Sequence, residues 1–172
     1  DSETVTDNTA KKIFGDANGI IIPGGFGGRA TEGMIATCKY ARENDVPCLG
    51  ICLGMQMMVI EYARNVCGLN GATSGEFDES AKHKVIDLMP DQRNVSLKGG
   101  TMRLGAYPCV IKKDTKAYSA YGKAEISERH RHRYEFNNDY RKIVSDCGMT
   151  LCGTSPDEKL VEMVEVGTNR FY

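Results

Sequence analysis

A short apolar run meets an amphipathic stretch at a cysteine between two glycines, Gly50-Ile51-Cys52-Leu53-Gly54-Met55-Gln56. Residues 47–51 are predicted to form a buried strand, and a sharp turn at Cys52 would lead into a helix. Gly50 and Gly54 lack the Cβ atoms that would clash at such a turn. At the start of a helix, unpaired backbone N–H groups and the helix dipole stabilise a thiolate, so a pKa below about 8.5 is expected for Cys52. An arbitrary cysteine is more often a small buried hydrophobe, but the flanking glycines favour a nucleophile.

Composition describes an ordinary globular chain. Its 172 residues suit one domain, and 41% hydrophobic residues with a net charge of -1 exclude a disordered or nucleic-acid-coating class. No apolar stretch approaches the ~20 residues of a membrane span. The basic run of residues 129–133 is too short, and too closely followed by Glu135, to be a nucleic-acid arm.

Seven cysteines occur without C-x-x-C spacing or a nearby histidine to complete a zinc site. We therefore expect no metal, reduced thiols and a cytoplasmic location, since no signal peptide is recognisable at Asp1. The sequence opens without methionine, so it can be a piece of something longer.

The first half alternates predicted strands and helices. Polar residues 1–18 suit a short helix that ends near Gly15, and residues 19–23 suit a strand buried on both faces. Helices are expected over residues 31–44 and from Met55 to Gly68, the second with one apolar face. This order predicts a parallel α/β arrangement with ligands at the strands' C-terminal ends. The glycine-rich loop of residues 24–28 should therefore lie beside Cys52.

The second half is less regular, and we see neither an internal repeat nor a low-complexity linker. Strands are expected at residues 85–89, 107–111, around Leu151 and at 160–166; helices at 114–121 and 140–146; glycine-bearing loops at 71–76 and 99–105.

Two motifs resemble class I, triad-type glutamine amidotransferases: Pro23-Gly24-Gly25-Phe26-Gly27 is similar to their oxyanion loop, and residues 50–56 to their nucleophile elbow. Three further stretches resemble the glutaminase domain of CTP synthases, namely Gly75-Glu76-Phe77, residues 99–105 and residues 128–135. The resemblance covers residues 16–166. It implies an α/β fold with an open, mostly parallel sheet and helices on both faces.

The resemblance also implies a reaction. In this family a cysteine thiolate attacks the side-chain amide of glutamine, releases ammonia and forms a thioester that water hydrolyses. Cys52 would be the nucleophile, and the backbone N–H groups of Gly25 and Leu53 would stabilise the oxyanion. A phosphate cradle at residues 24–28 is the alternative from the residues alone, but the Lys-Ser or Lys-Thr that such a loop needs does not follow.

Substrate recognition is implied by the same similarity. Glu76 would meet the ammonium group of glutamine and Arg133 its carboxylate, while Gln56 and the backbone of Gly25 and Phe26 would orient it. Without the family, Glu76 and Arg133 would be interpreted as solvated surface charges. His130 and His132 are assigned a structural role, bracing the loop that carries Arg133.

A nucleophile of this kind needs a histidine base oriented by a carboxylate, and the family carries both in a His-Pro-Glu motif after the strand that matches residues 160–166. Neither is found before Tyr172, and the only histidines are His83, His130 and His132. Relative to the family the single domain thus looks incomplete at both ends. Residues omitted from the printed sequence, a truncated gene product and an inactive relative are the three explanations. We favour the first, because an uncovered sheet would expose too much apolar area.

The family also implies partners. A separate N-terminal synthase domain would use ATP and Mg²⁺ to convert UTP to CTP with the ammonia, GTP would act as an allosteric activator, and the full protein would be a homo-oligomer, a tetramer. Arg29 is a candidate for the response to GTP, with a surface arginine that lacks a partner as the alternative. The alternative hypotheses for the function of the chain are a catalytically incomplete module with an interaction or regulatory role, the amidotransferase of a different synthase, and a distantly related protein with a similar cysteine elbow.

Overall fold

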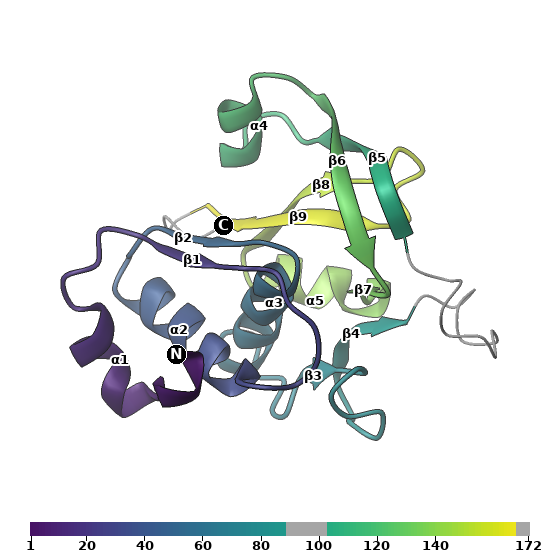
Figure 1. The fold of residues 1–172 in the computed structure, drawn as a ribbon. Coiled ribbons are helices and arrows are strands. Elements are labelled where there is room, and N and C mark those ends of the chain that lie inside the picture. Colours follow the sequence, from purple (N-terminus) through teal and green to yellow (C-terminus); the bar gives the residue numbers. More distant parts are fainter. Residues whose placement is uncertain (89–102, 168–172) are drawn as a thin grey trace.

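A computed structural model describes residues 1–88 and 103–167 (Figure 1). The helical elements are η1 (Ser2–Thr4), α1 (Asp7–Phe14), α2 (Thr31–Glu43), α3 (Leu53–Asn65), α4 (Lys116–Tyr121), η3 (Asn138–Tyr140) and α5 (Arg141–Asp146). The strands are β1 (Ile20–Ile22), β2 (Cys48–Gly50), β3 (Thr73–Ser74), β4 (Lys84–Leu88), β5 (Arg103–Ile111), β6 (Glu125–His132), β7 (Tyr134–Phe136), β8 (Met149–Thr154) and β9 (Val161–Val166).

The predicted helices are confirmed to within a few residues. Helix α1 stops at Gly15, and α4 is closed by Gly122 in the left-handed conformation with φ 69°, as its glycine predicted. The strand expected at residues 85–89 is β4, of which Met89 lies outside the described residues. Residues 99–102 of the predicted glycine loop also lie outside them, and residues 103–105 belong to strand β5 rather than to a loop. Within the described residues, no helix is both long and apolar enough to cross a membrane.

Helix α3 lies at the centre of the molecule. It contacts α2 as well as β1, β2, β3, β4 and β9, and in Figure 1 it runs beneath β1 and β2. Ten of its residues are buried, including Gln56 and Glu61. The expectation of a single apolar face is therefore wrong: neighbours cover α3 on all sides, and the helix that begins after Cys52 is the core of the large hydrophobic cluster.

Strands β1 and β2 pair in parallel, with Ile21 beside Leu49. Their lower face packs on the helices, since Ile22 is 3% exposed. On the other face Ile21 is 67% exposed and Leu49 40%. The prediction of a strand buried on both faces is wrong, because side chains alternate across a strand and helices α2 and α3 cover only one side of this pair.

The second half of the chain is antiparallel, so the expectation of a mostly parallel sheet holds only for β1–β2 and β3–β4. Strand β7 adds antiparallel to β4, and a four-stranded antiparallel sheet follows the order β6-β5-β8-β9. Strands β8 and β9 are joined by only six residues, too few for a parallel crossover. Strand β6 was not predicted: its buried Ile126 and His130 are each flanked by exposed polar or charged residues, so the segment resembles a surface stretch.

Candidate active site

The turn at Cys52 has a strained backbone. Cys52 follows β2 and caps the N-terminus of α3, with φ 57° and ψ -109°, a conformation that residues other than glycine rarely adopt. A Cβ atom on Gly54 would lie 2.1 Å from the carbonyl oxygen of Ile22, and one on Gly50 would lie 2.6 Å from the carbonyl carbon of Gly54. The glycines thus permit the close crossing of β1, β2 and α3, as the sequence predicted.

Two backbone N–H groups, those of Leu53 and Gly25, lie close enough to the Cys52 thiol to influence its pKa. Burial nevertheless raises the pKa of Cys52, these two donors lower it in part, and the carboxylates of Glu135 and Glu76 raise it further. The expected pKa below the usual cysteine value is therefore wrong, because loss of hydration disfavours the thiolate more than the helix start favours it. The two donors are those predicted for the oxyanion hole.

A cavity of about 290 Å³ opens beside the thiol. Its walls come from the loop after β1, the start of α3, the turn after β3 and the junction of β6 with β7. The lining residues are Gly25, Phe26, Cys52, Gln56, Glu76, Arg131, His132, Arg133 and Tyr134. Six of these, Gly25, Phe26, Cys52, Gln56, Glu76 and Arg133, were predicted as site residues, and the structure brings them together from segments up to 108 positions apart.

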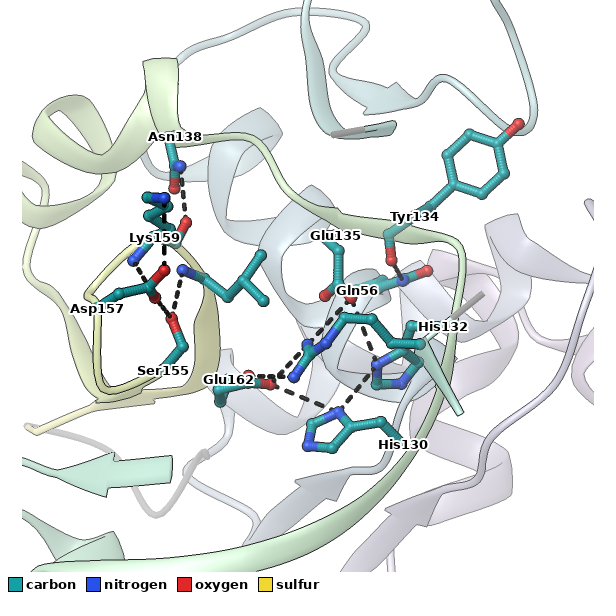
Figure 2. Close-up of polar contacts among 12 residues, drawn as sticks. Gln56, His130, His132, Tyr134, Glu135, Asn138, Ser155, Asp157, Lys159 and Glu162 are labelled. Carbon is teal, nitrogen blue, oxygen red and sulfur yellow. Dashed lines mark hydrogen bonds and ion pairs between the residues drawn. The ribbon is translucent and has the colours of Figure 1, made fainter. Parts of the chain in front are cut away.

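Two polar side chains fix the cavity walls. The backbone N–H of Gly27 donates to Oε1 of Glu76 at 3.0 Å, so Glu76 holds the glycine-rich loop. Nε2 of Gln56 donates to the carbonyl oxygen of Tyr134 at 3.0 Å (Figure 2). Because Gln56 is buried in α3, this bond ties the helix of the nucleophile to the opposite wall.

Sequence reasoning missed three lining residues, Arg131, His132 and Tyr134, which flank Arg133 at the β6–β7 junction. The Arg131 guanidinium lies 5.5 Å from the centre of the Phe26 ring, so this junction also contacts the glycine-rich loop. The signal that could have revealed them is their adjacency in the sequence to Arg133, because residues 131–134 line the cavity consecutively where β6 leads into β7.

A buried charge cluster lies behind that junction. Arg103 of β5 donates through Nη2 to Glu162 of β9 at 2.7 Å, and through Nη1 to Glu135 of β7 at 3.1 Å. Figure 2 shows His130 and His132 beside the two carboxylates. The Nδ1 atoms of the two histidines are 3.3 Å apart. These contacts fit the structural role predicted for both histidines.

The cluster shifts the pKa values of its members. Burial raises the pKa of Glu135 to about 7, although Arg103 lowers it in part and Glu162 raises it further. Burial lowers the pKa of His132 to about 4, with His130 and Arg103 acting in the same direction. His132 is therefore neutral at neutral pH.

The remaining candidates lie outside the cavity lining. His83 contacts Tyr140, with 3.4 Å between Nδ1 and the hydroxyl oxygen. Arg29 pairs with Glu3 at 2.6 Å on the surface, so the interpretation of Arg29 as lacking a partner is wrong. In residues 1–88 and 103–167, no three His, Cys, Asp or Glu side chains gather as a metal site.

Comparisons with known proteins agree with this geometry. The family model described as glutamine amidotransferase class-I matches residues 2–172. CTP synthases of Staphylococcus aureus strains JH9 and Newman are 58% identical over all 172 residues, which correspond to 32% of those proteins, so the chain spans about a third of their length. The solved glutaminase domain of Trypanosoma brucei CTPS, with bound acivicin, superposes with a TM-score of 0.93 and 36% identity over 100% of this chain and 68% of that one.

Proposed function

The chain belongs to the class-I glutamine amidotransferase family and corresponds to the glutaminase domain of CTP synthases, and we therefore propose that it hydrolyses glutamine to glutamate and ammonia with Cys52 as the nucleophile. The observation that carries the proposal is that the Cys52 thiol lies beside the N–H groups of Gly25 and Leu53 at the edge of the cavity of about 290 Å³. Six of the seven residues implied for glutamine chemistry line that cavity, and the seventh, Leu53, directly follows Cys52.

In the proposed reaction the Cys52 sulfur bonds to the side-chain carbonyl carbon of glutamine, and the carbonyl π electrons move to oxygen. The N–H groups of Gly25 and Leu53 stabilise that oxyanion, an interaction whose loss typically slows catalysis about 10²–10³-fold. Collapse of the intermediate expels the amide nitrogen as ammonia, after proton uptake, and leaves a thioester. Water then adds to the thioester carbonyl and releases glutamate and the thiol.

The cavity walls supply the groups for the amino-acid end of the substrate. Glu76 and Arg133 both line the cavity. Glu76 would accept hydrogen bonds from the ammonium group and Arg133 would donate to the carboxylate, and such charge-assisted hydrogen bonds are roughly twice as strong as neutral ones. Gln56 is oriented by its bond to Tyr134. A general base oriented by a carboxylate completes such a reaction, and we assign that role to none of His83, His130 and His132.

The whole-protein activity is a further proposal, supported by the names of the S. aureus relatives. Ammonia would pass to an N-terminal synthase domain of the same enzyme, which with ATP and Mg²⁺ would convert UTP to CTP within a homo-tetramer. The seven cysteines are free in the structure, which fits a reducing cytoplasmic location. GTP is proposed as an allosteric activator of the full protein, but Arg29 is not assigned to its binding, because the exposed Arg29 is paired with Glu3.

The test compares Cys52→Ala with Cys67→Ala, a matched change at another partly buried free cysteine. In the full protein, Cys52→Ala should abolish glutamine hydrolysis and leave ammonia-dependent CTP formation intact, whereas Cys67→Ala should retain both. Glutaminase activity that persists in Cys52→Ala refutes the assignment. A wild-type protein without any glutaminase activity would instead support the non-catalytic interpretation.

A further inference from the structure

Glu162 and Arg103 do not line the cavity of about 290 Å³ beside Cys52, yet they connect to its wall. Glu162 lines a second cavity, of about 400 Å³, which also borders Cys52. Glu162 belongs to β9 and its side chain is 2% exposed, while the Arg103 side chain on β5 is 11% exposed. Neither position was singled out for glutamine binding by the sequence. Their burial between the antiparallel sheet and β7 calls for a physical reason, because burying two carboxylates and one guanidinium is costly unless each group is held in good geometry.

The geometry of the cluster is directional. Arg103 uses both terminal nitrogens on Glu162, Nη2 at 2.7 Å and Nη1 at 3.3 Å, and this two-point contact fixes the plane of the guanidinium. The same Nη1 atom reaches Oε1 of Glu135 at 3.1 Å. The Tyr107 ring packs 4.5 Å from the guanidinium carbon and closes one side. Glu162 therefore sets where Arg103 points, and Arg103 sets where the Glu135 carboxylate lies.

Glu135 in turn adjoins the cavity wall. It directly follows Tyr134, whose carbonyl oxygen accepts the hydrogen bond from Gln56, and it lies 4.0 Å from Nδ1 of His132, a lining residue. Nδ1 of His130 lies 3.5 Å from Glu162 and so joins the two ends of the cluster. A continuous series of contacts thus runs from β9 through Glu162, Arg103 and Glu135 to the backbone that presents Arg133 and Tyr134.

We propose that Glu162 is a positioning residue for the glutamine cavity: it orients Arg103, which holds Glu135 and so fixes the β6–β7 junction against Gln56. The inference rests on the proposed function, since it assigns the cavity to glutamine. Loss of the Glu162 charge should weaken recognition of the amino-acid end of the substrate while the thiol and its two N–H donors stay in place.

The chain offers a matched control. Glu61 of α3 is 0% exposed, and its Oε1 lies 2.7 Å from Nη2 of Arg42. This is a buried ion pair of the same kind, and neither of its residues lines the cavity of about 290 Å³. Glu162→Gln and Glu61→Gln are the same chemical change at two carboxylates whose side chains are 2% and 0% exposed. Any general effect of breaking a buried ion pair is common to both.

The experiment measures inactivation of the full protein by acivicin, an electrophilic glutamine analogue, alongside alkylation of Cys52 by iodoacetamide, which needs no amino-acid recognition. For Glu162→Gln we expect the acivicin concentration at half-maximal inactivation rate to rise roughly tenfold, with the maximal rate and the iodoacetamide rate within about twofold of wild type. Glu61→Gln should leave the acivicin half-saturation and both rates within about twofold of wild type, even if it lowers the melting temperature as much as Glu162→Gln does.

An unchanged acivicin half-saturation in Glu162→Gln, or an equal rise in both variants, overturns the inference. Should Glu162→Gln fail to fold, Arg103→Lys replaces it, because lysine keeps the charge but cannot hold two carboxylates in a fork, and it must show the same rise. A wild-type protein that reacts with iodoacetamide but not with acivicin contradicts the proposed function, and this inference with it.

Discussion

At the residue scale, Cys52 combines a strained backbone with a partly buried thiol that lies beside the N–H groups of Gly25 and Leu53. The same donors face the sulfur in the resting state and would face the oxyanion during reaction. For the proposed reaction, this site would therefore contribute the position of the thiol relative to the two N–H groups rather than an unusually acidic thiol.

The raised pKa of Cys52 has a measurable consequence. Iodoacetamide reacts with the thiolate, so its rate follows the thiolate fraction. Because burial raises the pKa above its ordinary value, the alkylation rate of Cys52 should still be rising above pH 9. Mass spectrometry of the Cys52 peptide across pH 7–10.5, with a free cysteine peptide as reference, checks this. A plateau at or below pH 8 would contradict it.

Glu135 should make stability depend on pH. Its ordinary pKa of 4.5 becomes about 7 in the folded protein, so between these values the unfolded chain releases a proton that the folded protein keeps. Its contribution to stability is therefore fully present below pH 4.5 and is lost as pH rises to 7. The loss is about 3 kcal/mol, at 1.36 kcal/mol for each pH unit.

The Glu135→Gln variant cannot ionise at this position, so it lacks this loss. Relative to wild type, its free energy of unfolding should improve by about 3 kcal/mol between pH 4.5 and pH 7.5. Urea denaturation at several pH values in that range gives the comparison, and subtracting the two curves cancels His132, which titrates in both proteins. Parallel curves would show that Glu135 does not hold its proton.

Among individual residues, those carried by short motifs could be predicted, and six of them line the cavity. Glu162 could not be, because an acidic side chain in a sequence resembles a surface charge, and only the approach of β9 to β5 and β7 shows that it is buried. The raised pKa of Cys52 was missed for a similar reason: the helix start is visible in the sequence, whereas the burial that outweighs it depends on tertiary packing.

At the scale of elements, β1 separates two environments in adjacent residues. Ile22 is 3% exposed and packs in the large core, whereas Ile21 is 67% exposed. We expect Ile22→Ala to cost about 3 kcal/mol and Ile21→Ala less than about 1 kcal/mol. Chemical denaturation of the two variants measures the difference. An equal loss of unfolding free energy in the two variants would mean that the face of β1–β2 that carries Ile21 is also buried.

The first-half elements were predictable because local signals agree with the tertiary fold: β-branched runs, helical spacing and glycine or proline stops coincide. Strand β6 was not, since its pairing with β5 from Arg103↔His132 to Val110↔Glu125 is a long-range property. The all-round burial of α3 was likewise missed, because periodicity reports one apolar face and cannot show how many neighbours a helix has.

At the scale of the whole molecule, the described residues form two hydrophobic clusters of unequal size. The large one surrounds α3. The small one holds Cys109, Ile111 and Ile126, with Ala117, Tyr118 and Met163 packed against it, under α4 and the β5–β6 pair. In Figure 1, α4 and the upper ends of these strands stand apart from the helices around α3.

Local opening should follow this division. Because the small cluster buries little apolar area, amides of β6 and α4 should exchange with solvent through an opening about 2 kcal/mol less costly than that of residues 59–63 in α3. Native-state hydrogen exchange followed by mass spectrometry resolves the two regions. Protection of β6 equal to that of α3 would show that the clusters unfold as one unit.

The two glycines of the turn bear on how such sequences change over time. A Cβ at Gly54 would lie 2.1 Å from the Ile22 carbonyl oxygen whether or not residue 52 carries a thiol. The glycines are therefore required by the close packing of strand and helix and not by the thiol. A descendant that lost catalysis would be free to replace its cysteine but still obliged to keep Gly50 and Gly54. In such a lineage the glycine pattern would outlast the enzyme, and the residue between the glycines would record when selection for chemistry ended.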